Sequence, residues 1–286
     1  MNASIVCYNK RFYHDDEVPI RFNNRAFKFG DSFFETIRCN GNEALHFNLH
    51  YKRMIKALMS LKMEIASLPP QHELEHLISS LLKQNKCFGA SRVRIEVLRS
   101  GMGLYTPETN NVDFVIECSK LVSTNYELNK KGLLLGDFTE VKKGYNPISF
   151  FKSGNALPYI LASFEKVNCN VDDCFIYNNE GKIIEAISSN LFWIKDGVFY
   201  TSSVFSGCVG GIMRQVIIQI IKSSKWPNVI EVSGVQKEEL VNVDEMFLCN
   251  AIQGVQWIVG YNDRRYFNQM TRQLQQLLNE FTYQSI

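Results

Sequence analysis

The chain has 286 residues, a length that suits one large domain or two of modest size. Its 31 Lys and Arg residues and 29 Asp and Glu residues give a net charge of +2 without a basic face or tail, which argues against a nucleic-acid partner. No apolar run approaches the roughly 18 to 20 residues of a membrane span, and the N-terminal segment lacks the apolar region of a signal peptide. The eight cysteines, scattered without CxxC pairs, predict reduced thiols in a cytoplasmic protein rather than disulfides or a zinc site.

The first half of the sequence predicts strands and helices in one domain. Residues 5–13 alternate in the manner of an edge strand, and residues 33–47 predict two strands joined at an Asn-Gly turn. Helical periodicity and then strand patterns follow, in the order 48–63 (helix), 72–85 (helix), 91–100 (strand) and 112–119 (strand). The polar run 120–132 has no clear period. We therefore expect a smaller N-terminal domain over 1–120, a linker over 121–131 and a larger C-terminal domain over 132–286.

The second half also mixes strands and helices without strict βαβ repetition. After an opening strand and loop, the pattern predicts a helix at 155–168, strands at 173–179, 182–195 and 197–201, a helix at 212–225, a strand at 244–251 and a helix at 267–282. A glycine-rich turn, SGCVGG, precedes the helix at 212–225. The sequence thus predicts an α+β protein of two domains with a site between them.

One carboxylate stands out in the segment GKIIEAISSNLFWIKDG. Glu185 lies between Ile184 and Ala186 in what reads as a buried strand, although a strand glutamate more commonly faces solvent. A buried carboxylate left alone costs several kcal/mol, so it either takes up a proton or finds a cationic partner. The neighbouring residues of this segment are apolar, so the cationic partner of Glu185 must come from another part of the protein or from a ligand.

Three other features carry chemistry, and each has a simpler structural explanation. Lys152, in SFFKSGN, follows apolar residues; a desolvated lysine is a usable nucleophile, whereas most lysines at loop edges are merely exposed. In SGCVGGIMR the first helical amides, at Ile212 and Met213, can cradle a phosphate, but such turns are often only connections. Arg53 is suited to phosphate, although an exposed helical arginine is commoner.

A metal site at two histidines close to Arg53 in the sequence is the weaker alternative. His46 and His50 are spaced i, i+4, but no cysteine or carboxylate cluster lies near them in the sequence. A phosphate cradle, an arginine, a reactive lysine and a buried carboxylate together fit pyridoxal 5'-phosphate, which brings a phosphate, an aldehyde and a ring nitrogen that becomes cationic. We therefore expect the cofactor's ring nitrogen to be the partner of Glu185.

At these positions the sequence resembles the class IV aminotransferases, the fold-type-IV pyridoxal phosphate enzymes. Six ordered segments carry the resemblance: FKFGDSFFETIR, HYKRM, FKSGN, IIEAISSNLFW, YTSSVFSGCVGGIMRQ and VDEMFLCNAIQGV. It implies a two-domain fold like that of D-amino-acid aminotransferase, with the cofactor between the domains, and a homodimer acting on small molecules of amino-acid type. By the resemblance Lys152 binds the cofactor aldehyde, Glu185 contacts the pyridine nitrogen, and Arg53 with the amides of Ile212 and Met213 holds the phosphate.

Within that family, the motifs are most similar to those of 4-amino-4-deoxychorismate lyases. FGDSFFET is similar to the lyase pattern FGDGxFET, and Thr36 falls where lyases carry a threonine thought to help the lysine in proton transfer. The Lys-x-x-Asn spacing of Lys152 and Asn155 matches lyases and D-amino-acid enzymes. Ala251 stands where transaminases commonly place a phosphate-binding Ser or Thr.

Some residues depart from each pattern. Ser32 replaces a glycine of the lyases, and Gln256 and Trp257 replace their usual Pro-Val ending. Arg99 is not followed by the histidine with which D-amino-acid enzymes bind a substrate carboxylate. The expected function is therefore the lyase reaction, giving 4-aminobenzoate and pyruvate, with a branched-chain or D-amino-acid transaminase as the alternative. A non-enzymatic phosphate binder would leave Lys152 and Glu185 without roles.

Overall fold

The computed structural model describes residues 4–283, which divide into two compact units. The first unit contains the chain up to Thr124 together with Phe151–Asn155, and the second contains Asn125–Phe150 and the chain from Ala156 onward. The segment Phe151–Asn155 thus belongs to the first unit by its contacts, whereas the sequence pattern assigned it to the larger C-terminal domain. The reason is a pairing with the edge of a strand of the first unit, described below.

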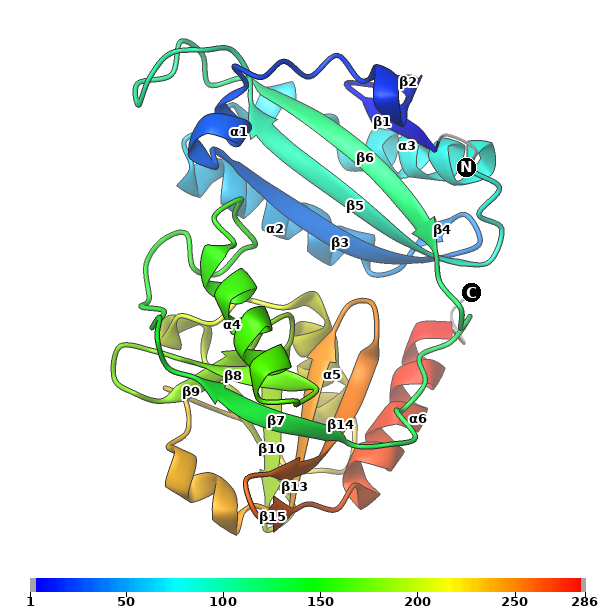
Figure 1. Cartoon of the computed structure of the whole chain (residues 1–286). Helices are drawn as coiled ribbons and strands as arrows, with labels where there is room; N and C mark the ends of the chain where they lie inside the picture. Colours follow the sequence, from blue (N-terminus) through cyan, green and yellow to red (C-terminus); the bar gives the residue numbers. More distant parts are fainter. Residues whose placement is uncertain (1–3, 284–286) are drawn as a thin grey trace. The chain divides into compact units, whose positions relative to one another are not determined.

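The first unit, within its described residues, is built on an antiparallel sheet of six strands in the order β2, β1, β6, β5, β3, β4. Helices α2 and α3 lie against one face of this sheet (Figure 1). The elements are β1 (Ile5–Tyr8), β2 (Arg11–His14), α1 (Arg25–Phe29), β3 (Ser32–Asn40), β4 (Glu43–Ala44), α2 (Phe47–Ser60), α3 (Gln71–Gln84), β5 (Ala90–Arg99) and β6 (Val112–Lys120). Alternate residues of β3 and β5, such as Phe33, Ile37 and Ile95, are buried in the core.

The second unit contains a sheet that closes on itself. Its described strands follow the order β12, β11, β10, β13, β14, β7, β8, β9, and β9 also pairs with β10, which returns the sheet to its own third strand. The strands are β7 (Leu133–Phe138), β8 (Asp173–Tyr177), β9 (Ile183–Ala186), β10 (Asn190–Lys195), β11 (Val198–Ser202), β12 (Ile230–Val232), β13 (Glu245–Asn250), β14 (Gly254–Tyr261) and β15 (Arg264–Arg265). Closure leaves β9 with neighbours on both sides, so its side chains are buried.

Over the described residues, three helices cover this sheet. Helix α4 (Leu157–Asn168) contacts β7 and β8, and helices α5 (Ile212–Ser223) and α6 (Gln269–Tyr283) contact each other and β13 (Figure 1). Short 3₁₀ helices occupy Asp15–Glu17, Ile65–Ser67, Val204–Ser206 and Lys237–Asn242. Over residues 4–283, none of the helices combines the length and the apolar character that crossing a membrane demands.

Most predicted elements are present, but two segments predicted as single strands are hairpins. Residues 5–13 form β1 and β2 around Asn9 and Lys10, both with positive φ, a conformation that suits a two-residue hairpin turn. Residues 182–195 form β9 and β10, which are separated by a turn at Ile187–Ser189 and paired antiparallel. The apolar run through this second segment hid the turn. Strand β14 had not been predicted at all.

A buried carboxylate ties helix α6 to the sheet. Glu245, at the start of β13, is 4 % exposed. Its oxygens accept hydrogen bonds from the backbone amides of Met270 and Thr271 and from the Thr271 hydroxyl, at 2.7–2.9 Å. Both amides lie in the first turn of α6, where they have no partner within the helix and where the helix dipole favours a negative charge.

We expect Glu245→Ala to lower the free energy of unfolding by about 2 to 3 kcal/mol, because it leaves two helix amides and a buried hydroxyl without their acceptor. Urea titration followed by circular dichroism measures the loss. Glu280→Ala, at an exposed position of the same helix, is the matched control and should stay within about 0.5 kcal/mol of the parent. Equal midpoints for the two variants would show that the cap contributes nothing.

Candidate active site

Lys152 lies against the edge of β3 in the first unit. The Lys152 carbonyl accepts a hydrogen bond from the Phe34 amide at 2.8 Å, and Phe33 forms an antiparallel bridge with Ser153. This register places Lys152 opposite Phe34, so both side chains point to the same face of the sheet. The Lys152 Nζ lies 5.6 Å from the centre of the Phe34 ring.

The Lys152 amine has a lowered pKa. Burial disfavours its charged form most, and the positive charges of Arg53, Arg92 and Arg94 add to the effect against the opposing charge of Glu35, so that its pKa is about 8. At neutral pH roughly a tenth of such an amine is uncharged, which is far more than for an ordinary lysine. The structure therefore gives Lys152 the property that a nucleophilic amine requires.

The face of the sheet that carries Lys152 is polar and rich in cations. Thr36 lies two residues beyond Phe34 on β3, and Arg94 stands opposite it on β5. The Arg94 guanidinium lies 3.7 Å from the centre of the Phe34 ring and makes an ion pair with Glu96 at 2.5 Å. Because side chains alternate along a strand, Phe34, Thr36, Arg94 and Glu96 all point away from the helices.

Arg53 reaches β3 from α2, in a buried ion-pair cluster that is close enough to Lys152 for its charge to act on the amine. Its Nε and Nη2 donate to the two oxygens of Glu35 on β3 at 2.7 and 2.6 Å, and His50 Nδ1 lies 2.6 Å from Glu35 Oε2. Burial alone would raise the pKa of Glu35, but the charge of Arg53 and the hydrogen bonds from His50 and Arg53 outweigh it and hold the pKa at about 2. Burial also lowers the pKa of His50, the effect of Glu35 opposing it only in part.

Glu185 is held in the second unit by three donors. Lys143 Nζ and the Tyr159 hydroxyl donate to Glu185 Oε1 at 2.7 and 2.9 Å, and the Val209 amide donates to Oε2 at 2.8 Å. Glu185 itself is 2 % exposed. The sequence had suggested a cofactor ring as the cationic partner of Glu185, and the structure adds a lysine of the chain itself.

The turn after β11 brings the N-terminus of α5 to the same carboxylate. Gly207 has φ +104°, and a Cβ there would lie 2.9 Å from the Lys143 carbonyl oxygen, so that only glycine allows the two backbones to approach. A Cβ at Gly211 would overlap the side chain of Asn190, which donates to the Val209 carbonyl at 2.7 Å. The glycines of SGCVGG thus fix the turn against the segment that carries Lys143.

The first turn of α5 is a potential anion site. Ile212 and Met213 open the helix after Gly211, and over the described residues no side chain caps this end by a hydrogen bond. Backbone amides at a helix N-terminus attract phosphate through their hydrogen bonds and the helix dipole. The side chains of Ile212 and Met213 are buried, so only their amides can serve a ligand.

Ala251 follows β13 in a polar turn of the second unit. Its carbonyl accepts a hydrogen bond from the Tyr126 hydroxyl at 3.1 Å. The preceding residue, Asn250, donates to the Ser189 hydroxyl at 3.0 Å, and Ser189 lies in the turn between β9 and β10. The sequence had singled out Ala251 only through the resemblance. The structure places it just after β13, the strand that pairs with β10.

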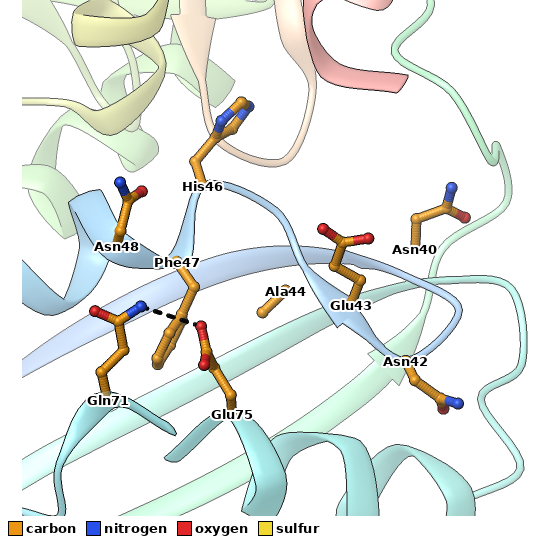
Figure 2. Close-up of a pocket in the computed structure, with 9 residues that line it drawn as sticks. All are labelled: Asn40, Asn42, Glu43, Ala44, His46, Phe47, Asn48, Gln71 and Glu75. Atoms are coloured by element: carbon orange, nitrogen blue, oxygen red, sulfur yellow. Dashed lines mark hydrogen bonds between the residues drawn. The ribbon is translucent and has the colours of Figure 1, made fainter. Parts of the chain in front are cut away.

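A pocket of about 670 Å³ lies away from these residues, at the β3–β4 turn and the start of α2. Figure 2 shows its lining, with Gln71 and Glu75 of α3 joined by a hydrogen bond on one side and the side chains of the turn on the other. It is open to solvent and lies at the opposite end of β3 from Phe34. Its residues are Asn40, Asn42, Glu43, Ala44, His46, Phe47, Asn48, Gln71 and Glu75.

The predicted site residues fall into two groups, one in each unit. Lys152, Thr36 and Arg53 belong to the first unit, and Glu185, Ile212, Met213 and Ala251 belong to the second. Sequence reasoning missed Glu35, Lys143 and Tyr159. Glu35 had a signal, because the alternation of β3 places it with Phe33 and Ile37 on the buried face. Lys143 lies in a loop without hydrophobic periodicity, so no sequence signal marked it.

The chain is similar in sequence to known proteins over most of its length. Residues 32–261 match the family model described as amino-transferase class IV. The chain is 25% identical over 272 residues to an aminodeoxychorismate lyase of Vibrio harveyi, covering 92% of this chain and 97% of that one. It is also 25% identical over 284 residues to a D-alanine aminotransferase of Staphylococcus haemolyticus, covering 96% and 97%.

Solved structures share the fold. A branched-chain amino acid aminotransferase of T.th., solved with pyridoxamine 5'-phosphate, aligns with a TM-score of 0.86 at 22% identity over 98% of this chain and 94% of that one. The chain therefore belongs to the class IV aminotransferase family, with its two-domain α+β fold, and is a pyridoxal phosphate-dependent enzyme. The described residues fit this cofactor: an amine of lowered pKa, an uncapped helix N-terminus and a buried carboxylate are suited to its aldehyde, phosphate and ring nitrogen.

We expect Arg53→Met to lower the free energy of unfolding of the cofactor-free protein by about 3 to 5 kcal/mol at pH 7, because it leaves the Glu35 carboxylate buried without its main counter-charge. The folded pKa of Glu35 lies below its unfolded value of 4.5, so its contribution is present above pH 4.5 and is lost as the pH falls towards 2. The difference between variant and parent should therefore shrink over that range.

Urea midpoints measured at several pH values give this difference. Lys52→Met, at an exposed position of the same helix, removes a cation without touching Glu35 and should behave as the parent. A loss for Arg53→Met that does not depend on pH between 4.5 and 2.5 would contradict the role of the ion pair.

Proposed function

We propose that this enzyme is a 4-amino-4-deoxychorismate lyase, which converts its substrate to 4-aminobenzoate and pyruvate. The observation that carries the proposal is the position of Thr36. Thr36 is buried and lies on the same face of the sheet as Lys152. It is two residues along β3 from Phe34, which pairs with Lys152. A hydroxyl on that face is suited to assist an amine in a second proton transfer, which a lyase needs.

We assign the cofactor contacts from the chemistry of each group. Lys152 binds the aldehyde, Glu185 accepts a hydrogen bond from the protonated ring nitrogen, and the Ile212 and Met213 amides hold the phosphate. Arg53 is assigned to the phosphate with them, in addition to its pairing with Glu35. Ala251, one residue beyond β13, is assigned to the edge of the same phosphate site through the resemblance alone.

The cofactor supplies an electron sink for the negative charge that develops when the substrate loses a proton. Lys152 removes that proton from the carbon bearing the amino group. The bond between the ring carbon and the enolpyruvyl oxygen then breaks, which leaves the aromatic amine and the enolate of pyruvate. The enolate takes up a proton, for which Lys152 is the donor and the Thr36 hydroxyl orients or relays the proton.

The cations near Lys152 support this substrate. Both products carry a carboxylate, so the substrate carries two, whereas leucine or alanine carries one. Arg94 lies at the ring of Phe34, and Arg92 follows the same alternation on β5, opposite Arg38. Arginine binds carboxylates through paired hydrogen bonds, and a sheet face with several arginines is suited to a dianion.

A transaminase is the second candidate. The similarity to a D-alanine aminotransferase extends over 96% of the chain at the same 25% identity as that to the lyase, so overall similarity favours neither. Lys152 would then move the proton between the substrate carbon and the cofactor, and Thr36 would have no step to perform.

Helix α4 supports a homodimer. Five apolar residues on one side of it are exposed by 43–73 %, although its opposite side packs into the core through Ala162. They recur at the spacing of one helical face: Leu157, Ile160, Leu161, Phe164 and Val167. A continuous apolar face of this kind is typical of a surface that another protein covers, and we propose a second copy of this chain.

The lyase assignment predicts that Thr36→Val, which removes the hydroxyl at nearly constant volume, lowers the rate of 4-aminobenzoate and pyruvate formation at least tenfold while cofactor binding is retained. A tenfold rate corresponds to about 1.4 kcal/mol of barrier. Product release is followed by chromatography, and cofactor content by its absorbance. Lys152→Ala is the control that should lose all turnover.

The opposite outcome identifies the second candidate. Rapid turnover of leucine or D-alanine with 2-oxoglutarate by the parent, no pyruvate from aminodeoxychorismate and no effect of Thr36→Val would replace the lyase by a transaminase.

We expect Ile160→Glu combined with Phe164→Glu to shift the protein from dimer to monomer, because two carboxylates within the apolar face of α4 would have to be desolvated on association. Sedimentation velocity measures the mass. Val241→Glu, at an exposed apolar position of the same unit outside α4, is the matched control and should leave the dimer intact. A parent that sediments as a monomer at micromolar concentration would refute the proposal.

A further inference from the structure

Lys143 and Tyr159, both partly buried, form a cluster with the buried Glu185 that the proposed function has not used. Lys143 Nζ lies 2.7 Å from Glu185 Oε1 and 2.6 Å from the Tyr159 oxygen, and the Tyr159 hydroxyl donates to the same Oε1 at 2.9 Å. The Lys143 side chain is 18% exposed and that of Glu185 is 3% exposed. All three residues belong to the second unit.

The hydrogen bonds leave one acceptor position on Glu185. An ionised carboxylate has about four lone-pair positions, two on each oxygen. The two on Oε1 are occupied by Lys143 and Tyr159, and one on Oε2 is occupied by the Val209 amide. The remaining position, on Oε2, suits the single N–H of a protonated pyridine ring. The cofactor therefore does not need to displace Lys143.

Two other titratable groups next to Glu185, Tyr159 and Cys208, are neutral at pH 7. Burial raises the pKa of Tyr159 well above 10, and the charge of Glu185 adds to this, so the phenol remains a hydrogen-bond donor. Burial and the charge of Glu185 likewise raise the pKa of the Cys208 thiol to about 12. Lys143 is therefore the cation in direct contact with this carboxylate among the described residues.

We propose that Lys143 is a positioning residue that keeps the shared proton on the ring nitrogen of the cofactor rather than on Glu185. The proton in the hydrogen bond between Glu185 and the ring can reside either on the ring nitrogen or on the carboxylate. Lys143 is hydrogen-bonded to the carboxylate. Moving the proton from the carboxylate to the ring takes it away from the lysine charge. The Coulomb interaction thus favours the protonated ring with an ionised Glu185.

Without the charge of Lys143, the neutral pair of Glu185 and the ring becomes more stable relative to the ionised pair. A buried site of low polarity disfavours charge separation, so an uncharged carboxyl group bonded to an uncharged ring would become the competing state. A neutral ring is a weaker electron sink, and the loss would appear in the rate while the cofactor stays bound. This inference rests on the assignment of Glu185 to the ring nitrogen.

The test uses the holoenzyme reconstituted with pyridoxal phosphate labelled with ¹⁵N in the ring. Nitrogen NMR separates a protonated from an unprotonated pyridine, independently of turnover. In Lys143→Met the ring signal should move towards that of the neutral ring, and the rate of product formation should fall at least tenfold. Lys143→Gln removes the charge but keeps a donor, and it provides the same reading if the methionine variant folds poorly.

Two variants serve as matched controls. Lys143→Arg keeps the charge and should retain the signal of the parent, as should Lys142→Met, which removes a cation from the exposed neighbouring position. Tyr159→Phe removes a hydrogen bond without a charge and should shift the signal less than Lys143→Met does.

Glu185→Gln separates the two possible failures. A signal for Glu185→Gln equal to that of the parent would remove the assignment of Glu185 itself, and this inference with it. A neutral ring in Glu185→Gln together with a protonated ring in both Lys143→Met and Lys143→Gln would keep that assignment and refute the role of Lys143.

Discussion

The cost of burying a carboxylate governs much of this structure. Glu35, Glu185 and Glu245 are each at most 4 % exposed, and each is neutralised in a different way. Glu35 is paired with the guanidinium of Arg53 and with His50. Glu185 is hydrogen-bonded to Lys143, Tyr159 and a backbone amide, and Glu245 accepts hydrogen bonds from the first amides of α6. Only the last is purely structural in our interpretation. The same requirement thus builds a helix cap in one place and prepares groups for chemistry in two others.

The edge of β3 is the second organising feature. Residues 32–34 have backbone groups that β4 does not reach, because β4 pairs only with the far end of the strand. The segment with Lys152 satisfies them, through Phe34 to Lys152 and Gly154 to Ser32. A backbone requirement therefore decides where the lysine lies, and a residue from the second half of the chain joins the first unit. There burial lowers the pKa of its amine, and the nearby arginine charges add to the effect.

The residues assigned to catalysis are supported differently in the two units. In the first, Lys152 and Thr36 share a polar face on a sheet whose other face is fixed by α2 and α3, so their relative position follows from strand register. In the second, closure of the sheet buries Glu185 between β8 and β10, and the glycines of the β11–α5 turn bring the Val209 amide and the α5 N-terminus to it. Strands hold Thr36 and Glu185, whereas Lys152 lies in the connection between β7 and α4 and is fixed by its pairing with β3. Fixed positions of this kind suit proton transfer over hydrogen-bond distances.

The sequence alone determined the family, the cofactor and the principal helices and strands, because these depend on ordered motifs and on hydrophobic period. It marked Lys152 and Glu185 from local context, and Thr36 through the resemblance to the lyases. It did not show that residues 182–195 fold back as a hairpin, since an apolar run reads the same with or without a buried turn. Nor did it show the partners of Glu185: Lys143 lies 42 residues before it, Tyr159 26 before it and Val209 24 after it. Such contacts carry no local period, and only the closure of the sheet brings them together.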